Sequence, residues 1–183
     1  MSDSITPPEN FSTARLILRK PRETDAPLIF ASYGQDLEVS RYLIWRPHRD
    51  LSDAQEAVER FLEDWRTGSK FCWLLFRREG GELVGSIAAR IDGQGMHLGY
   101  LLAQPFWAQG LMSEAVNALV DWAFSEPSIF RVWAVCDVEN ESSARLLERN
   151  GFQREGTLRK WSLHPNVSAM PRDCYCYAKT REG

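Results

Sequence analysis

The segment from Tyr100 to Ala115 has the residue types and spacing best suited to chemistry. It reads as the end of a strand, a short loop that holds Gly110, and a helix whose first turns carry Ser113 and Glu114. The first backbone amides of a helix have no partner within it and lie at the positive end of its dipole. Gly110, moreover, has no Cβ to keep a phosphate away. The segment therefore predicts a pyrophosphate site, although a strand, loop and helix with one glycine is also a common structural unit.

Spacing argues against three other kinds of site. Gly93 and Gly95 lie between two predicted strands, whereas a dinucleotide-binding glycine loop must open a helix. No Walker lysine motif occurs, so nucleotide hydrolysis is unsupported. The cysteines have neither zinc-ligand spacing nor a CxxC redox pair, and we expect buried free thiols in a reducing compartment and no metal. The four are Cys72, Cys136, Cys174 and Cys176.

Length and composition favour one soluble globular domain. Of the 183 residues, 44% are hydrophobic and 26% are charged, which is close to the average for soluble proteins. No apolar run reaches the ~20 residues that cross a bilayer, and residues 1–10 do not resemble a signal peptide. The net charge of −3 argues against a nucleic-acid partner. We expect a cytoplasmic protein with a flexible N-terminus at 1–12 and a single domain at 13–183.

Hydrophobic patterns place strands and helices in alternation, with hairpins in the middle of the chain. The predicted strands cover 15–19, 71–77, 83–91, 96–102, 131–136, 152–163 and 174–179. The predicted helices cover 24–34, 52–67, a stretch between Pro105 and Pro127, and 140–150. Ser52 with Gln55 predicts a capping box, and Gly151 a left-handed helix cap. The pattern predicts an α+β fold, a mixed sheet covered by helices.

Five segments match, in order and separation, the motifs of a known family. They read ARLILR at 14–19, LGY at 98–100, WAQGLMSEA at 107–115, DVENESS with NGF at 137–143 and 150–152, and EGTLR at 155–159. They resemble the ERLxLR, IGY, WGxGYATEA, N-x-x-S…GF and EGxLR motifs of the GCN5-related N-acetyltransferase (GNAT) superfamily, in its ribosomal-protein-alanine (RimJ/RimL-like) branch. The resemblance covers about 13–181. It implies a sheet of about seven strands with helices on both faces, in which strands 96–102 and 131–136 splay apart around acyl-CoA.

The activity that this resemblance implies is transfer of an acetyl group from acetyl-CoA to an amine by direct attack. An α-amino group has a pKa of about 8, against about 10.4 for a lysine, so an N-terminus needs less help from a base. We therefore expect the N-terminal α-amine of a peptide or protein as acceptor. The alternatives are a small amine, such as an amino acid, polyamine or antibiotic, and an acyl-CoA-binding regulator without turnover. A homodimer is an expectation by analogy alone.

The coenzyme contacts of the family carry over onto matching positions. The pyrophosphate would bind the backbone amides of Ala108, Gln109, Gly110, Leu111, Met112 and Ser113. The pantetheine arm would pair, as a β-strand does, with Leu101, Leu102 and Ala103. Asn140 would hydrogen-bond that arm from the opposite side of the gap. Ala108 stands where the branch usually has glycine.

Catalysis requires a donor for the oxyanion and an acid for the departing thiolate. A backbone amide near Leu102 is the expected oxyanion donor. Many family members place a tyrosine acid seven residues after the asparagine, but this chain has Leu147 there. We therefore expect Ser143 to act near the thiol sulfur, its alternative being an ordinary serine in the first turn of a helix.

Fewer sequence features identify the general base and the acceptor site than identify the coenzyme site. His97 stands where the branch often has glutamate, and an ordinary histidine pKa near 6.5 suits a base. Glu155 is a second candidate and Asp173 a third, and each could instead be an ordinary strand residue. Aromatic walls suit amine recognition, and the residues expected to line the acceptor site, or else to belong to the core, are Tyr42, Trp45, Arg46, Trp161 and His164.

Overall fold

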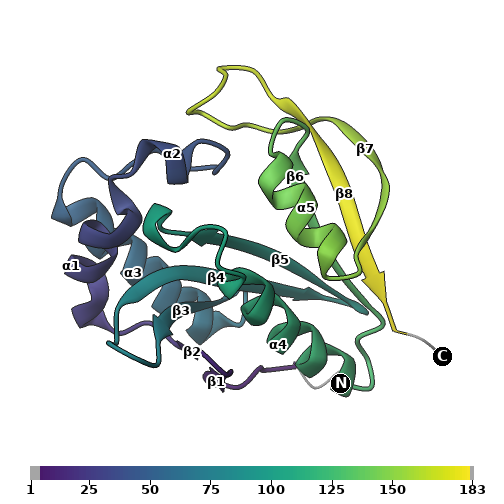
Figure 1. Cartoon of the computed structure of the whole chain (residues 1–183), viewed down its shortest axis with the longest axis horizontal. Helices are drawn as coiled ribbons and strands as arrows, with labels where there is room; N and C mark the ends of the chain where they lie inside the picture. The colour runs from purple at the N-terminus through teal and green to yellow at the C-terminus, as the bar shows by residue number, and fades with distance from the viewer. Residues whose placement is uncertain (1–4, 182–183) are drawn as a thin grey trace.

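One eight-stranded mixed sheet forms the centre of the computed structural model, which describes residues 5–181. Its strands lie in the order β1-β2-β3-β4-β5-β6-β8-β7 (Figure 1). All neighbours are antiparallel except β5 and β6, which are parallel. The strands are β1 (Asn10–Ser12), β2 (Leu16–Arg19), β3 (Phe71–Arg77), β4 (Leu83–Asp92), β5 (Gly95–Leu102), β6 (Arg131–Asp137), β7 (Gln153–Ser162) and β8 (Arg172–Thr180).

The mixed sheet confirms the predicted fold class and adds one strand to the seven expected. That strand, β1, lies in the segment predicted as a flexible N-terminus, and its Phe11 packs edge-on against Trp73 at a centroid distance of 5.5 Å. The indole N–H of Trp73 also donates to the carbonyl of Pro8. Residues 1–4 of that segment lie outside the described residues.

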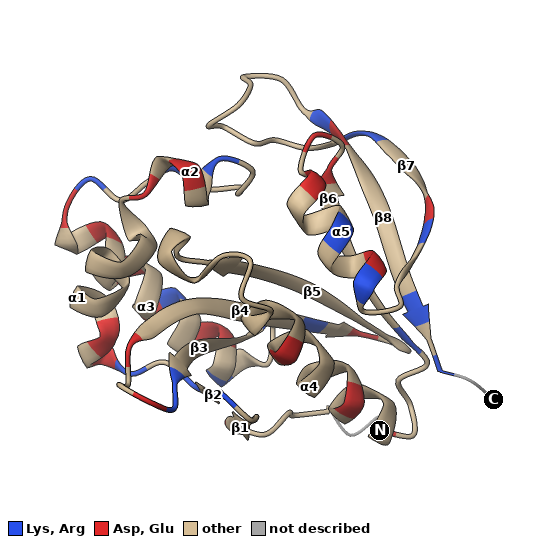
Figure 2. Ribbon diagram, viewed as in Figure 1, with Lys and Arg blue, Asp and Glu red and all other residues tan. Residues whose placement is uncertain are grey.

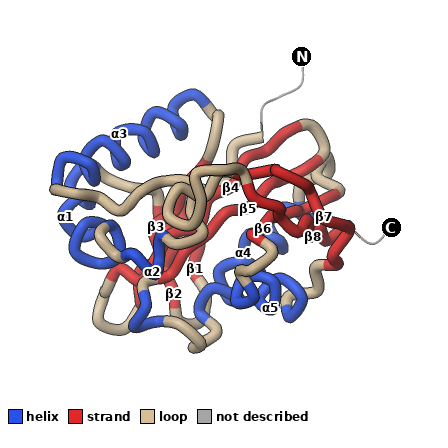
Figure 3. The backbone as a smooth tube through the Cα atoms, turned by 90° about the horizontal axis from the view of Figure 1, so that it is seen from above, coloured by secondary structure: helices blue, strands red, loops and turns tan. Residues whose placement is uncertain are grey.

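Helices cover both faces of the sheet (Figure 3). They are α1 (Ala26–Ile29), α2 (Leu37–Ser40), α3 (Leu51–Thr67), α4 (Leu111–Ser125) and α5 (Glu141–Arg149). Buried apolar residues of α1 and α3 pack against β3 and β4, whereas those of α4 and α5 pack against β5, β6 and β8 on the other face. In residues 5–181, no helix combines the length and apolar character that crossing a membrane requires.

Two local predictions differ from the structure. The predicted helix 24–34 is three short pieces, a 3-10 turn at Glu23–Asp25, α1, and a π-helical turn at Phe30–Gly34. Helix α3 is capped by Asp50, whose carboxylate accepts from the N–H of Ser52, so the predicted cap at Ser52 is wrong by two residues. Aspartate is as good a cap as serine, and the sequence offers both.

Positive charge is dispersed and the cysteines are unpaired. Lysine and arginine residues are spread over several elements rather than gathered on one (Figure 2). All four cysteines are free, and Cys72, Cys136 and Cys174 are buried while Cys176 is half-buried.

Candidate active site

The centre of the sheet contains a gap between β5 and β6. The two strands pair only from Gly95 with Arg131 to Leu98 with Ala134. Beyond that point β5 stays paired with β4 as far as Leu102, and β6 stays paired with β8 as far as Asp137. The strands therefore diverge over their last residues, as the predicted splay requires.

Backbone polar groups line this gap on both sides. Antiparallel neighbours alternate between residues that bond to each other and residues whose N–H and C=O face away. The Ala103 N–H donates to the carbonyl of Val84, so Leu101 and Ala103 direct their groups toward β4. Tyr100 and Leu102 therefore turn theirs toward the gap. By the same reasoning, the Val138 N–H bond to Asp173 turns the backbone groups of Val135 and Asp137 toward β5.

One gap-facing acceptor is already used. The indole N–H of Trp107 donates to the carbonyl of Leu102 at 2.7 Å. The gap-facing backbone groups of β5 that are still available to a ligand are the N–H and C=O of Tyr100 and the N–H of Leu102. An extended, amide-bearing ligand can pair with these groups as an added strand would.

The loop before α4 supplies a second cluster of donors. Gly110 caps α4 in a left-handed conformation with φ of 74°, and Ala108 has φ of 59°. Among the described residues, the backbone N–H groups of 108–113 donate to no protein atom. Six free amides at the positive end of a 15-residue helix make an anion site of the predicted kind.

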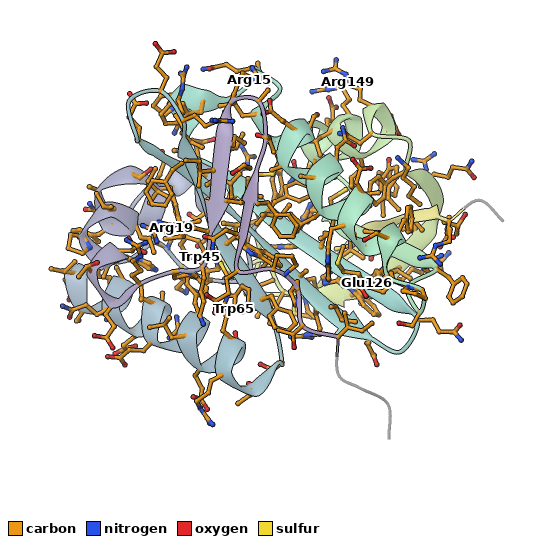
Figure 4. The ribbon with its side chains drawn as sticks, turned by 90° about the horizontal axis from the view of Figure 1, so that it is seen from below. Arg15, Arg19, Trp45, Trp65, Glu126 and Arg149 are labelled. Carbon is orange, nitrogen blue, oxygen red and sulfur yellow. The ribbon has the colours of Figure 1, made fainter. Side chains whose placement is uncertain are left out.

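Side chains from far along the chain hold this loop. The guanidinium of Arg15 (labelled in Figure 4) donates to the Glu114 carboxylate at 2.8 Å and to the Gln109 carbonyl at 2.9 Å. Its bonds, with those of Thr13 and the Arg15 N–H, lower the pKa of Glu114 against the effect of burial, which raises it. On the other side, Asn150 donates to Ser113 Oγ at 3.0 Å.

Ser143 and Tyr100 meet beside the gap, with their hydroxyl oxygens 2.9 Å apart. Burial raises the pKa of the nearby Cys136 thiol to about 11, and Ser143 partly lowers it. Asn140 caps α5 by accepting from the Ser143 N–H at 3.2 Å. This leaves the amide nitrogen of Asn140 to donate elsewhere, because in the described chain it meets no protein acceptor.

His97 lies on the opposite face of β5 from Tyr100, because successive strand side chains alternate. Its ring is 4.3 Å from that of Trp133 between centroids. Burial lowers the pKa of His97, and the positive charge of Arg90, its cross-strand neighbour, lowers it further. On the same face, a methyl group added at Gly99 would meet no heavy atom within 4 Å, so open space adjoins the gap there.

The other two predicted bases are engaged elsewhere. Both oxygens of Glu155 accept from Arg131, at 2.6 and 2.5 Å, and these bonds lower the pKa of Glu155. Asp173 accepts from the Lys160 N–H at 2.9 Å. The bonds from Arg131 therefore make Glu155 a weaker base than a free carboxylate.

The predicted acceptor residues lie on two segments at one end of the gap. The Tyr42 hydroxyl donates to the carbonyl of Glu139, just beyond β6, at 3.4 Å. The amide of Asn166, between β7 and β8, donates to the carbonyls of Ser40 and Trp45 at 2.7 and 2.8 Å. These bonds join α2 and the segment after it to the β7–β8 connection, which lie at the same end of the molecule (Figure 1).

The side chains themselves are dispersed along that rim. Trp45 is half-buried, with its ring 5.2 Å from that of His48, whereas Arg46 and Trp161 are exposed. His164 is buried, with Nε2 3.8 Å from the Asp137 carboxylate, which Arg172 also holds. His164 therefore has a structural partner in the rim.

Comparisons with known proteins agree with this geometry. Residues 15–153 match the family model described as an acetyltransferase (GNAT) domain. The chain is 32% identical to the uncharacterized N-acetyltransferase YoaA of Bacillus subtilis, over 93% of this chain and 97% of the relative. It is 28% identical to the ribosomal protein uS5-alanine N-acetyltransferase of Escherichia coli, over 87% of this chain and 86% of that protein.

Two solved structures share the fold. The microcin C7 self-immunity acetyltransferase MccE, in complex with acetyl-CoA and AMP, superposes with a TM-score of 0.86 at 21% identity, covering 96% of this chain and 98% of that one. RimL, the ribosomal L7/L12 alpha-N-protein acetyltransferase in complex with coenzyme A, superposes with a TM-score of 0.83 at 22% identity, covering 94% and 98%.

Proposed function

The chain belongs to the GNAT acetyltransferase family and is an acyl-CoA-dependent N-acetyltransferase, and we propose that its acceptor is the N-terminal α-amine of a peptide or protein. A relative of that specificity, acting on an alanine of a ribosomal protein, aligns over most of the chain. His97, whose pKa is lowered, supports the same acceptor because it is a weak base.

In this proposal the diphosphate of acetyl-CoA binds the free amides of residues 108–113, and the pantetheine arm runs along β5 into the gap. Pairing with the arm falls to Tyr100 and Leu102, because Leu101 and Ala103 direct their backbone groups to β4. The Tyr100 N–H is nearer the closed end of the gap and the Leu102 N–H nearer the loop. The Tyr100 N–H therefore suits the thioester oxygen, and the Leu102 N–H suits the pantetheine arm.

The acceptor would approach from the other face of β5. Gly99 leaves open space on that face. His97 is the preceding residue on the same face, two positions earlier in β5, where the strand is still paired with β6. The amine nitrogen attacks the thioester carbon, the oxyanion takes a hydrogen bond from a backbone N–H, and His97 accepts the proton that the nitrogen loses. The sulfur leaves toward Tyr100 and Ser143. The observation that supports the proposal is the divergence of β5 and β6, which leaves the backbone N–H groups of Tyr100 and Leu102 facing the gap.

The state of His97 favours an α-amine over a lysine side chain. A histidine with a lowered pKa is a weak base. Roughly a tenth of an α-amine of pKa about 8 is already neutral at pH 7, whereas a lysine of pKa about 10.4 is almost wholly charged. A weak base therefore matches an N-terminus.

Thiol release from acetyl-CoA across a panel of amines tests the proposal. The panel holds peptides that begin with Ala, Ser or Met, the same peptides with a blocked N-terminus and an internal lysine, free amino acids, spermidine and an aminoglycoside. We expect turnover on the free peptides alone. Turnover on a small amine alone would show that the acceptor is that amine and not a peptide. If no amine in the panel is acetylated although acetyl-CoA binds, the protein would be an acyl-CoA-binding protein without turnover.

A further inference from the structure

Tyr100 and Ser143 form a hydroxyl pair inside the gap although they are 43 residues apart in sequence. Tyr100 lies on β5 just beyond the last residue paired with β6, and Ser143 lies in the first turn of α5. Burial raises the pKa of Tyr100. Its hydroxyl therefore keeps its proton throughout the working pH range and acts as a hydrogen-bond donor.

Counting protons gives the direction of the bonds. A tyrosine hydroxyl has one proton to donate, and so has a serine hydroxyl. Within residues 5–181, the only hydrogen-bond partner of the Tyr100 hydroxyl is Ser143 Oγ. A buried donor must be satisfied, so the tyrosine donates to the serine, and the proton of Ser143 is left for a third atom.

A coenzyme in the gap would supply that third atom. Ser143 lies in the first turn of α5 beside the diverging ends of β5 and β6. The thiol end of a coenzyme that enters between these strands would meet the Ser143 hydroxyl. Ser143 is thus held by the Tyr100 hydroxyl, with its own proton available for the coenzyme sulfur.

We propose that Tyr100 positions Ser143 so that the serine hydroxyl donates to the coenzyme sulfur as the thioester breaks. The inference rests on the seating of acetyl-CoA given above. The C–S bond breaks with its electron pair on sulfur, and Ser143 donates to the growing negative charge. The bond from Tyr100 polarises the serine O–H and makes it a stronger donor. The proton lost by the acceptor nitrogen balances the one that the thiolate finally takes, so no further reactant is required.

The position of Leu147 strengthens this assignment. It stands seven residues after Asn140 and is fully buried in the core. Helix α5 therefore contributes no phenol to the sulfur side. Strand β5 brings one there through Tyr100, and it acts through Ser143 rather than on the substrate.

Coenzyme A bound to the protein gives a test that needs no acceptor. Thiolates absorb in the ultraviolet, so a pH titration of the complex reports the pKa of the bound thiol, with the complex of S-methyl coenzyme A as blank. We expect Tyr100→Phe to raise that pKa by about one unit, a tenfold loss of thiolate. The blank carries the same protein thiols and removes their signal. Burial raises the pKa of Cys72 to about 12 and of Cys136 and Cys174 to about 11, and raises that of Cys176.

A double-mutant cycle separates positioning from a direct or merely structural role. In a Ser143→Ala background, Tyr100→Phe should leave the bound thiol pKa unchanged. The matched control is Tyr175→Phe, since Tyr175 packs on the same face and its hydroxyl meets no partner in the described chain. Equal shifts in both backgrounds, or a Tyr100→Phe titration like the wild type, would overturn the inference.

Turnover gives a second readout. With a productive amine, Tyr100→Phe should lower kcat about tenfold and leave the KM for acetyl-CoA unchanged, as expected for loss of about one hydrogen bond in the transition state. If KM rises instead and kcat holds, the tyrosine serves coenzyme binding and the inference fails. If the proposed acceptor is wrong, the amine panel will show it, and the titration of the bound thiol will still test the role of Tyr100.

Discussion

Removal of the Arg15 guanidinium should weaken the binding of acetyl-CoA without changing the chemical step. Arg15 directly precedes β2, yet it holds the Gln109 carbonyl and the Glu114 carboxylate at the start of α4. Hydrogen bonds to charged groups contribute about 1.5–3 kcal/mol when shielded. Because the Arg15 side chain is 48% exposed, water and salt reduce this, and about 1–2 kcal/mol for the whole contact is reasonable.

That loss corresponds to a rise of roughly 5- to 30-fold in the KM for acetyl-CoA in Arg15→Ala. If the loop binds the diphosphate as proposed, acetyl-pantetheine, which lacks that group, should show little change. Arg66→Ala is the matched control, because Arg66 makes a comparable pair with Glu63 on α3, away from the loop. Equal effects on both thioester donors, or a fall in kcat with KM unchanged, would refute the reasoning that Arg15 organises the phosphate site.

Three further predictions concern single positions. Ala108→Gly should stabilise the fold by about 1 kcal/mol in denaturant titration, since it removes a left-handed conformation from a residue with a Cβ; a loss of stability would contradict this. The lowered pKa of His97 keeps its basic form present below pH 6.5, so kcat/KM should fall only at a more acidic pH, and His97→Gln should abolish that limb. Arg90→Gln should move the limb toward higher pH, and no movement would show that the limb belongs to another group. Gly99→Val should raise the KM for the acceptor while the Kd for coenzyme A stays constant, because its side chain fills the open space on the acceptor face; a weakened Kd would place the coenzyme there instead.

Several features followed from local sequence. The apolar runs that begin β3 and β4, the helical spacing of α4 and the left-handed Gly151 are each set by a few neighbouring residues, and the structure has all of them. The free amides before α4 also follow from local sequence, because they depend only on where a strand stops and a helix begins.

Other local signals were ambiguous because two residues competed for the same task. Asp50 and Ser52 can both cap α3, and only the backbone path shows that Asp50 does so. The short helix α2, capped by Asp36, has too few residues to give a period. Glu155 reads as a free carboxylate in sequence, yet Arg131 holds it from a neighbouring part of the sheet.

The sequence by itself determined the elements, their order, the family motifs and the helix start that can hold a diphosphate. Only the tertiary structure decided which groups meet across the gap. The register of β5 against β4 turns the backbone groups of Tyr100 and Leu102, rather than those of Leu101, toward the gap. The packing of α5 brings Ser143 to Tyr100, and the turn before β2 brings Arg15 to the loop before α4. Such contacts join residues 43 to 94 positions apart, and periodicity, which reports only on a residue's near neighbours, carries no information about them.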